Sequence, residues 1–95
     1  MPSVRVPEAE LTQLFDRLDL WHKADVGVLT PVEEPGARMP ARLCEGGQSF
    51  FVRLRNAAGL DVARIHYIAC PDGNLLRWPS ALLLGEVTLY RVAHD

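Results

Sequence analysis

The sequence predicts an α+β fold, with one amphipathic helix at the N-terminus followed by a series of short strands. Apolar residues repeat with a helical period of about 3.6 near the start of the chain, and with a period of two in several later segments. The connections between those later segments are short, which favours antiparallel pairing because parallel strands need long crossovers. The 95 residues fit a single domain, 1–95.

The helix is predicted over residues 7–22. Its apolar stripe has members three and four positions apart, namely Leu11, Leu14, Phe15, Leu18 and Trp21. Pro7 suits the first helical position, where its missing N–H costs nothing. Glu8 and Glu10 lie at the positive end of the helix dipole, and Lys23 lies at the negative end. We therefore expect one uninterrupted helix whose whole stripe packs into the core.

Strands are predicted where apolar and polar residues alternate, and turns where glycine, proline, asparagine and aspartate cluster. The segments after the helix are a strand Ala24–Thr30, a loop Pro31–Gly36, an edge strand Arg38–Cys44, two strands Ser49–Asn56 and Asp61–Cys70, a short strand Asn74–Trp78, a helical turn Pro79–Leu84 and a last strand Glu86–Val92. We expect five or six short strands in a curled, mainly antiparallel sheet or a half-open barrel, with the helix packed on one face. A flat meander is the alternative architecture.

The polar side of the two best-supported strands is rich in arginine. Arg53 and Arg55 alternate along one strand, Arg64 and His66 alternate along the next, and Arg91 on the last strand is expected to join them. Guanidinium groups suit phosphate and carboxylate by their fork geometry, so this face is a candidate site for an anion or a partner. The competing interpretation pairs these arginines with acids from residues 1–47, which carry eight acidic against five basic groups.

Other functional classes find less support. The pI near 5.9 is far from the basic value of most nucleic-acid-binding domains. His66 and Cys70 are four positions apart in a predicted strand and therefore about 13 Å apart, too far to share one metal ion. No nucleotide or cofactor motif occurs, so no cofactor and no metal are predicted. A small enzyme with a cleft around His66 and Cys70 remains an alternative.

The expected environment is the cytoplasm. No apolar stretch approaches the roughly 20 residues of a membrane-spanning helix, and the first residues do not resemble a secretion signal. Cys44 and Cys70 are therefore expected to be reduced thiols, since disulfides belong to oxidising compartments.

The favoured function is a non-enzymatic accessory protein that binds a protein partner or itself as a homodimer. The chain is 48% hydrophobic, and a small domain often places such apolar surplus in an interface between subunits. Short strands with open edges would also favour pairing with another chain. The candidate interface residues are Trp78, Leu82, Leu83 and Leu84.

Overall fold

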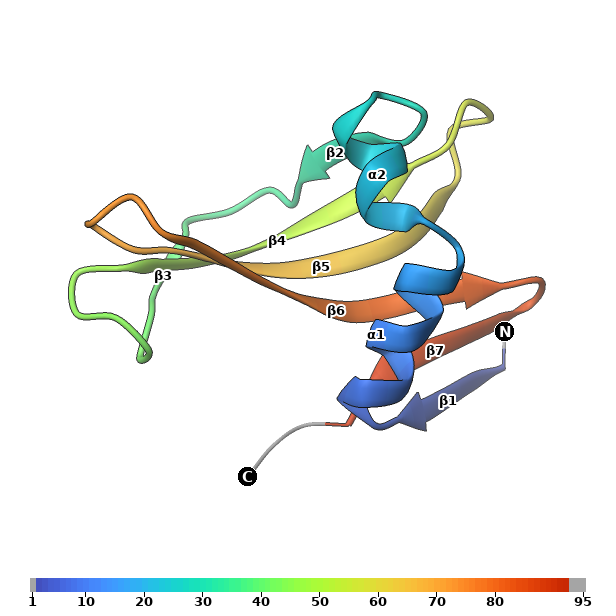
Figure 1. Cartoon of the computed structure of the whole chain (residues 1–95), viewed down its shortest axis with the longest axis horizontal. Helices are drawn as coiled ribbons and strands as arrows, with labels where there is room; N and C mark the ends of the chain where they lie inside the picture. The colour runs from blue at the N-terminus through green and yellow to red at the C-terminus, as the bar shows by residue number, and fades with distance from the viewer. Residues whose placement is uncertain (1, 93–95) are drawn as a thin grey trace.

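The computed structural model describes residues 2–92 and shows an α+β fold in two layers, with two short helices on one face of a mixed, mostly antiparallel sheet (Figure 1). Its elements are β1 (Ser3–Val6), α1 (Glu8–Arg17), α2 (Leu20–Asp25), β2 (Thr30–Glu33), β3 (Met39–Pro40), β4 (Gln48–Arg55), β5 (Asp61–Ala69), β6 (Leu75–Leu84) and β7 (Val87–Arg91). The strand order is β1-β7-β6-β5-β4-β2, and β3 pairs with β4 beside β2. Every pair is antiparallel except β1 with β7.

The sheet is open, and this corrects the predicted curled sheet or half-open barrel. Its path runs from β1 at one edge to β2 at the other, without closure. It has seven strands rather than five or six, because β1 was not predicted. Four residues between Pro2 and Pro7 are too few to show an alternation. β1 can lie parallel to β7 because almost the whole chain serves as their crossover.

The predicted single helix is broken into two. Asp19 separates α1 from α2 with a left-handed backbone, at φ 57, which aspartate tolerates better than most residues. The break lets the buried side chains of α1, Leu11 and Phe15, and that of α2, Leu20, enter the same core. Trp21 was expected inside the core but is only partly buried, and the Arg77 guanidinium lies 4.3 Å from its ring.

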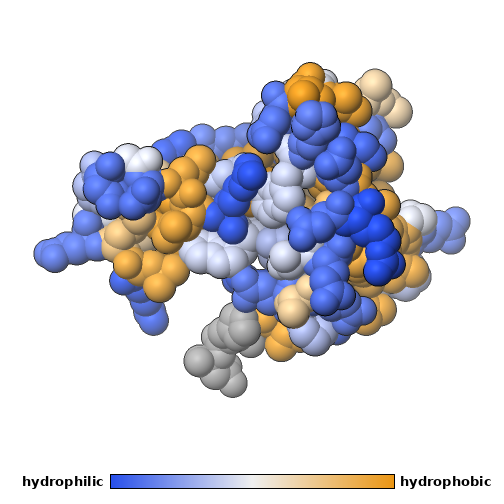
Figure 2. Space-filling view, in the orientation of Figure 1, coloured by the Kyte–Doolittle hydropathy of each residue, from blue (hydrophilic) through white to orange (hydrophobic). Residues whose placement is uncertain are grey.

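The predicted strand Ala24–Thr30 is wrong. α2 continues to Asp25, and the following turn leaves Val26 and Val28 exposed. Between them Gly27 has a φ of 83, so the alternation of two valines here marks a turn and not a strand. Hydrophobic surface is visible at this turn, at the top of Figure 2.

The next two predictions on this part of the chain are also corrected. The predicted loop Pro31–Gly36 contains most of β2, and the predicted strand Arg38–Cys44 keeps only the two residues of β3. Both strands pair with β4 alone and contain a proline, Pro31 or Pro40. Proline is compatible with such edge positions because it lacks the N–H that a central strand would need.

The antiparallel hairpin of β4 and β5 is confirmed. Phe51 lies opposite His66, and Arg53 lies opposite Arg64. The alternate side chains of these strands pack into the core beneath the helices: Leu54, Ala63 and Ile65 belong to one cluster with Val6, Leu11, Phe15, Leu20, Leu29 and Leu82. The arginine-bearing sides therefore point away from the helices, as predicted.

β6 replaces the predicted helical turn Pro79–Leu84. The strand runs on to Leu84, and its pairing with β5 passes from Pro79 to Ala81, which leaves Ser80 as an extra residue in a β-bulge. A proline is tolerated at a bulge because the ladder is interrupted there. The bulge shifts the alternation, so that Leu82 enters the core while Leu83 points to the opposite face.

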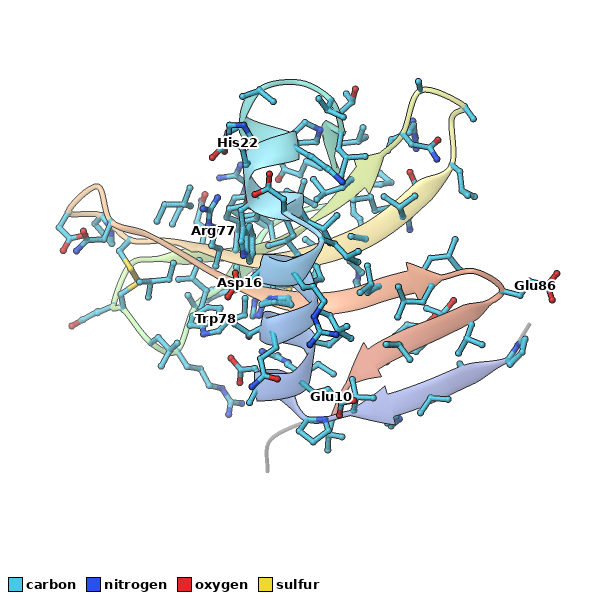
Figure 3. All side chains as sticks on the ribbon, turned by 45° about the vertical axis from the view of Figure 1, so that its right-hand side comes forward. Glu10, Asp16, His22, Arg77, Trp78 and Glu86 are labelled. Carbon is cyan, nitrogen blue, oxygen red and sulfur yellow. A yellow bond between two sulfur atoms is a disulfide. The ribbon has the colours of Figure 1, made fainter. Side chains whose placement is uncertain are left out.

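Cys44 and Cys70 form a disulfide, which corrects the expectation of reduced thiols. The bond ties the β3–β4 loop to the end of β5 and is visible as a yellow bond at that end of the sheet (Figure 3). The cysteines are 26 positions apart, and closing such a loop stabilises the folded state by roughly 3 to 4 kcal/mol in the chain-entropy model.

Among residues 2–92, neither helix has the length and apolar character needed to cross a lipid bilayer. The cytoplasmic location stays a prediction.

Candidate functional site

The face of the sheet opposite the helices carries the candidate site, and we call it the open face. No helix covers it in Figure 1. Register and alternation place these side chains on it: Ser49, Phe51, Arg53 and Arg55 from β4, Val62, Arg64 and His66 from β5, Trp78 and Leu83 from β6, and Thr88 and Tyr90 from β7. It combines a charge cluster, a row of rings and an apolar groove.

The charge cluster consists of Glu34, Arg53, Arg55, Asp61 and Arg64. Arg64 donates to both carboxylate oxygens of Glu34, at 2.6 Å through Nε and 3.0 Å through Nη2. Arg53 donates through Nε to the same carboxylate at 3.1 Å, and Arg55 donates through Nε to Asp61 at 2.9 Å. The hydrogen bond from Arg64, followed by that from Arg53, lowers the pKa of Glu34. The bond to Asp61 raises the pKa of Arg55.

This pairing removes the main support for an anion site. Three of the predicted residues, Arg53, Arg55 and Arg64, come together as expected, but each already binds an acid of the same chain. Arg91 ends β7, three strands away from β4, and its charge acts on His66 rather than within this group of arginines. Anion binding stays a prediction, and the geometry favours the interpretation in which acids of the same chain satisfy the arginines.

A row of three rings crosses β4, β5 and β6. The rings of Phe51 and His66 stack at 4.7 Å with an angle of 17°, and His66 meets Trp78 at 5.7 Å and 43°. The Arg64 guanidinium lies 3.7 Å from the Phe51 ring. Phe51 and His66 turn one ring face each toward the other, so these two faces are not free to stack on a nucleic-acid base.

His66 forms a close pair with a residue that sequence reasoning missed. Ser49 Oγ lies 2.6 Å from His66 Nε2, within hydrogen-bond distance. Burial lowers the pKa of His66, and the positive charges of Arg91 and Arg64 lower it further, so the imidazole is neutral at pH 7. Cys70, which the alternative hypothesis of a small enzyme placed in a cleft with His66, is bonded to Cys44. The signal for Ser49 was its alternation with Phe51, which places both on one face.

The apolar groove lies between β5 and β7 and has a volume of about 480 Å³. Apolar and charged side chains line it side by side: Leu60, Val62, Ala81, Leu83 and Tyr90, with Glu34, Arg53, Asp61 and Arg64. Leu60 and Tyr90 are 51% and 40% exposed, so the groove opens to solvent. Its size lies within the range of small-molecule and side-chain binding pockets.

The four predicted interface residues divide between core and surface. Leu82 is 2% exposed and belongs to the core, whereas Leu83 lines the groove and Leu84 is 37% exposed. Trp78 is partly buried within the row of rings.

Residues 2–92 hold no group of three or more His, Cys, Asp or Glu side chains arranged for a metal ion. Comparisons with protein-family models, with curated proteins and with solved structures give no match for this chain.

Proposed function

We propose that this chain is a binding protein that self-associates as a homodimer through the apolar groove of its open face. The observation that carries the proposal is the one-sided cover of the sheet: the helices pack on one face only, and the other face holds a groove with exposed apolar walls. A solvated sheet face normally carries polar side chains, so exposed apolar groups there indicate an interaction surface.

The groove has the composition of a binding surface. Its walls are apolar and include Tyr90, a residue type that often contributes strongly to interfaces. Four members of the charge cluster line the same groove, so it combines apolar and charged groups, as interfaces with an apolar centre and a polar rim do.

A second copy fits this surface because the charge cluster carries both signs. In a two-fold contact each copy presents the same patch, so the patch must complement itself. Arg53 is 48% exposed and is shared between Glu34 at 3.1 Å and Asp61 at 3.7 Å, which leaves it free to turn toward a carboxylate of the other copy. A standard interface needs about 800 Å² per partner, roughly one eighth of the 6291 Å² surface of this chain.

The edges of the sheet are poorer surfaces for association. β1 is flanked by Pro2 and Pro7, and β2 contains Pro31. Each proline removes one N–H that an added strand would need, and edge prolines are a common protection against strand pairing. The open face is therefore the surface on which we expect the contact.

Sedimentation velocity or light scattering at micromolar concentration tests the proposal. We expect a dimer for the unchanged chain, and at least ~tenfold weaker association for Tyr90→Glu, because a charge in the groove must be desolvated on contact. The matched control is Val26→Glu, which places the same charge on another exposed apolar residue, in the α2–β2 turn. A chain that stays monomeric at hundreds of micromolar, or a control that dissociates as readily as Tyr90→Glu, rules the proposal out.

A further inference from the structure

The pair of Ser49 and His66 has the geometry of a nucleophile and its base. The 2.6 Å between Ser49 Oγ and His66 Nε2 is the reach that proton transfer needs. Both side chains are partly exposed, so a small molecule can approach them. In the tautomer that carries its proton on Nδ1, the neutral imidazole accepts a hydrogen bond from the hydroxyl through Nε2.

The row of rings fixes the imidazole. In serine hydrolases a third group, usually a carboxylate, holds the histidine in place. Here Phe51 stacks on the imidazole at 4.7 Å, and Trp78 approaches it at 5.7 Å from the neighbouring strand. Rings on the two strands that flank β5 restrict the plane of the imidazole, and the hydrogen bond with Ser49 keeps Nε2 toward the hydroxyl.

A small hollow opens beside Ser49. It has a volume of about 120 Å³ and lies between β4 and the β2–β3 loop, with Gly36, Ala37 and Arg38 among its lining residues. The backbone amides of Gly36 and Ala37 donate no hydrogen bond within residues 2–92. Arg38 is fixed at the rim by two bonds to Glu33, at 2.8 and 3.2 Å. The guanidinium of Arg38 lies 3.8 Å from the ring of Phe50, on the side of β4 opposite to Ser49, so the groups that can stabilise the oxyanion of an acyl transfer here are backbone amides.

We propose that Ser49 is an acyl acceptor, with His66 as its base, and that it reacts with esters of short acyl groups which the hollow admits. This activity lies on a different part of the open face from the groove, and it does not depend on self-association.

The reaction balances with the ester and water alone. Ser49 Oγ attacks the carbonyl carbon while its proton passes to His66 Nε2, and the carbonyl electrons move to the oxygen. The bond to the leaving alcohol then breaks, and His66 returns the proton to that alcohol. Water repeats the two steps on the acyl-serine, which releases the carboxylic acid and restores the hydroxyl.

p-Nitrophenyl acetate tests the proposal on the unchanged full chain. We expect one acetyl group per chain in the intact mass soon after mixing, located on Ser49 by peptide mapping, and an initial burst of p-nitrophenolate that matches it. Ser49→Ala should abolish this acetylation, while Ser80→Ala, which removes a partly exposed serine at the bulge of β6, should leave it unchanged. The mapping needs no variant, so a folding defect in Ser49→Ala does not affect the test.

His66→Gln separates a base from a purely structural partner. Glutamine keeps a hydrogen bond to the hydroxyl but takes no proton, so the acylation rate should fall by at least ~tenfold. The rate should also fall in acid, as the pH passes below the lowered pKa of His66 and the imidazole becomes protonated near the charges of Arg91 from β7 and Arg64 from β5. Acetylation of Lys23 or Ser80 at the same rate as Ser49, or an unchanged rate in His66→Gln, would overturn the proposal.

Discussion

The two faces of the hairpin β4–β5 use the same strands for opposite purposes. On the covered face Leu54 and Ile65 are 0% exposed and fill the core under the helices. On the open face, one residue along each strand, Arg53 and Arg64 remain partly exposed and share Glu34. The covered face stabilises the fold by burial, whereas the open face has to satisfy its charges locally.

This difference indicates that, in a two-layer domain of this size, the residues that stabilise the fold and the residues available for binding lie on different faces of the sheet. Side chains of the covered face contact both layers, so a change there disturbs the sheet and the helices together. Side chains of the open face contact neighbours on the sheet, and Arg53 and Arg64 also bind Glu34 of the β2–β3 loop. We therefore expect open-face substitutions to change interactions with other molecules at a small cost in folding stability.

Substituting one phenylalanine on each face tests this separation, and we expect it to give the largest change in the free energy of unfolding. Phe15 is 0% exposed in the core, and Phe15→Ala should lower the free energy of unfolding by about 3 to 5 kcal/mol because it leaves a cavity. Phe51→Ala removes the same atoms from the open face, where the ring is only partly buried, and should cost less than half as much. Urea denaturation of the two variants gives both values. Equal losses would show that the two faces do not differ as described.

The disulfide tests the end of the sheet that neither helix covers. Reduction, or the double substitution Cys44→Ser with Cys70→Ser, should lower stability by roughly 2 to 4 kcal/mol, because the unfolded chain regains the freedom of a loop of this length. Thermal unfolding with and without a reductant measures the loss. The double variant is the matched control, since a reductant should not shift its melting temperature. If reduction leaves the unchanged chain as stable as before, the bond does not contribute as proposed.

The covered face was largely predictable from the sequence. The alternation of β4 and β5 extends over eight and nine residues, and one side of each strand has to be apolar because a helix packs on it. The same reasoning found the apolar side chains of the helices, such as Phe15, although not the break at Asp19, which depends on a single left-handed residue. Long patterns with one buried side constrain the structure strongly.

The partners on the open face could not be predicted in the same way. Glu34 is 30 positions from Arg64 and directly follows β2, in a segment for which the sequence predicts a loop. Ser49 reaches His66 only because the hairpin register puts them diagonally across the sheet. A single extra residue, Ser80, decides which leucine of β6 is buried. Each of these depends on register or on a long-range contact, and neither leaves a local pattern.

Substituting Glu34 should give the smallest change in stability, and it tests most specifically whether the open face satisfies its own charges. Its pKa is lowered by hydrogen bonds from Arg64 and Arg53, so the unfolded chain binds a proton more readily than the folded one. The ionised carboxylate therefore stabilises the fold at neutral pH, and this contribution is lost as the pH falls below about 4.5 and through the lower pKa of the folded state. Glu34→Gln should cost about 1 kcal/mol at pH 7, because the pair is only partly buried, and the difference from the unchanged chain should shrink in acid. Denaturation curves between pH 3 and pH 7 measure this, with Glu45→Gln on the exposed β3–β4 loop as the control. A difference that stays constant across this range would mean that the open face does not depend on its own carboxylate to hold its arginines.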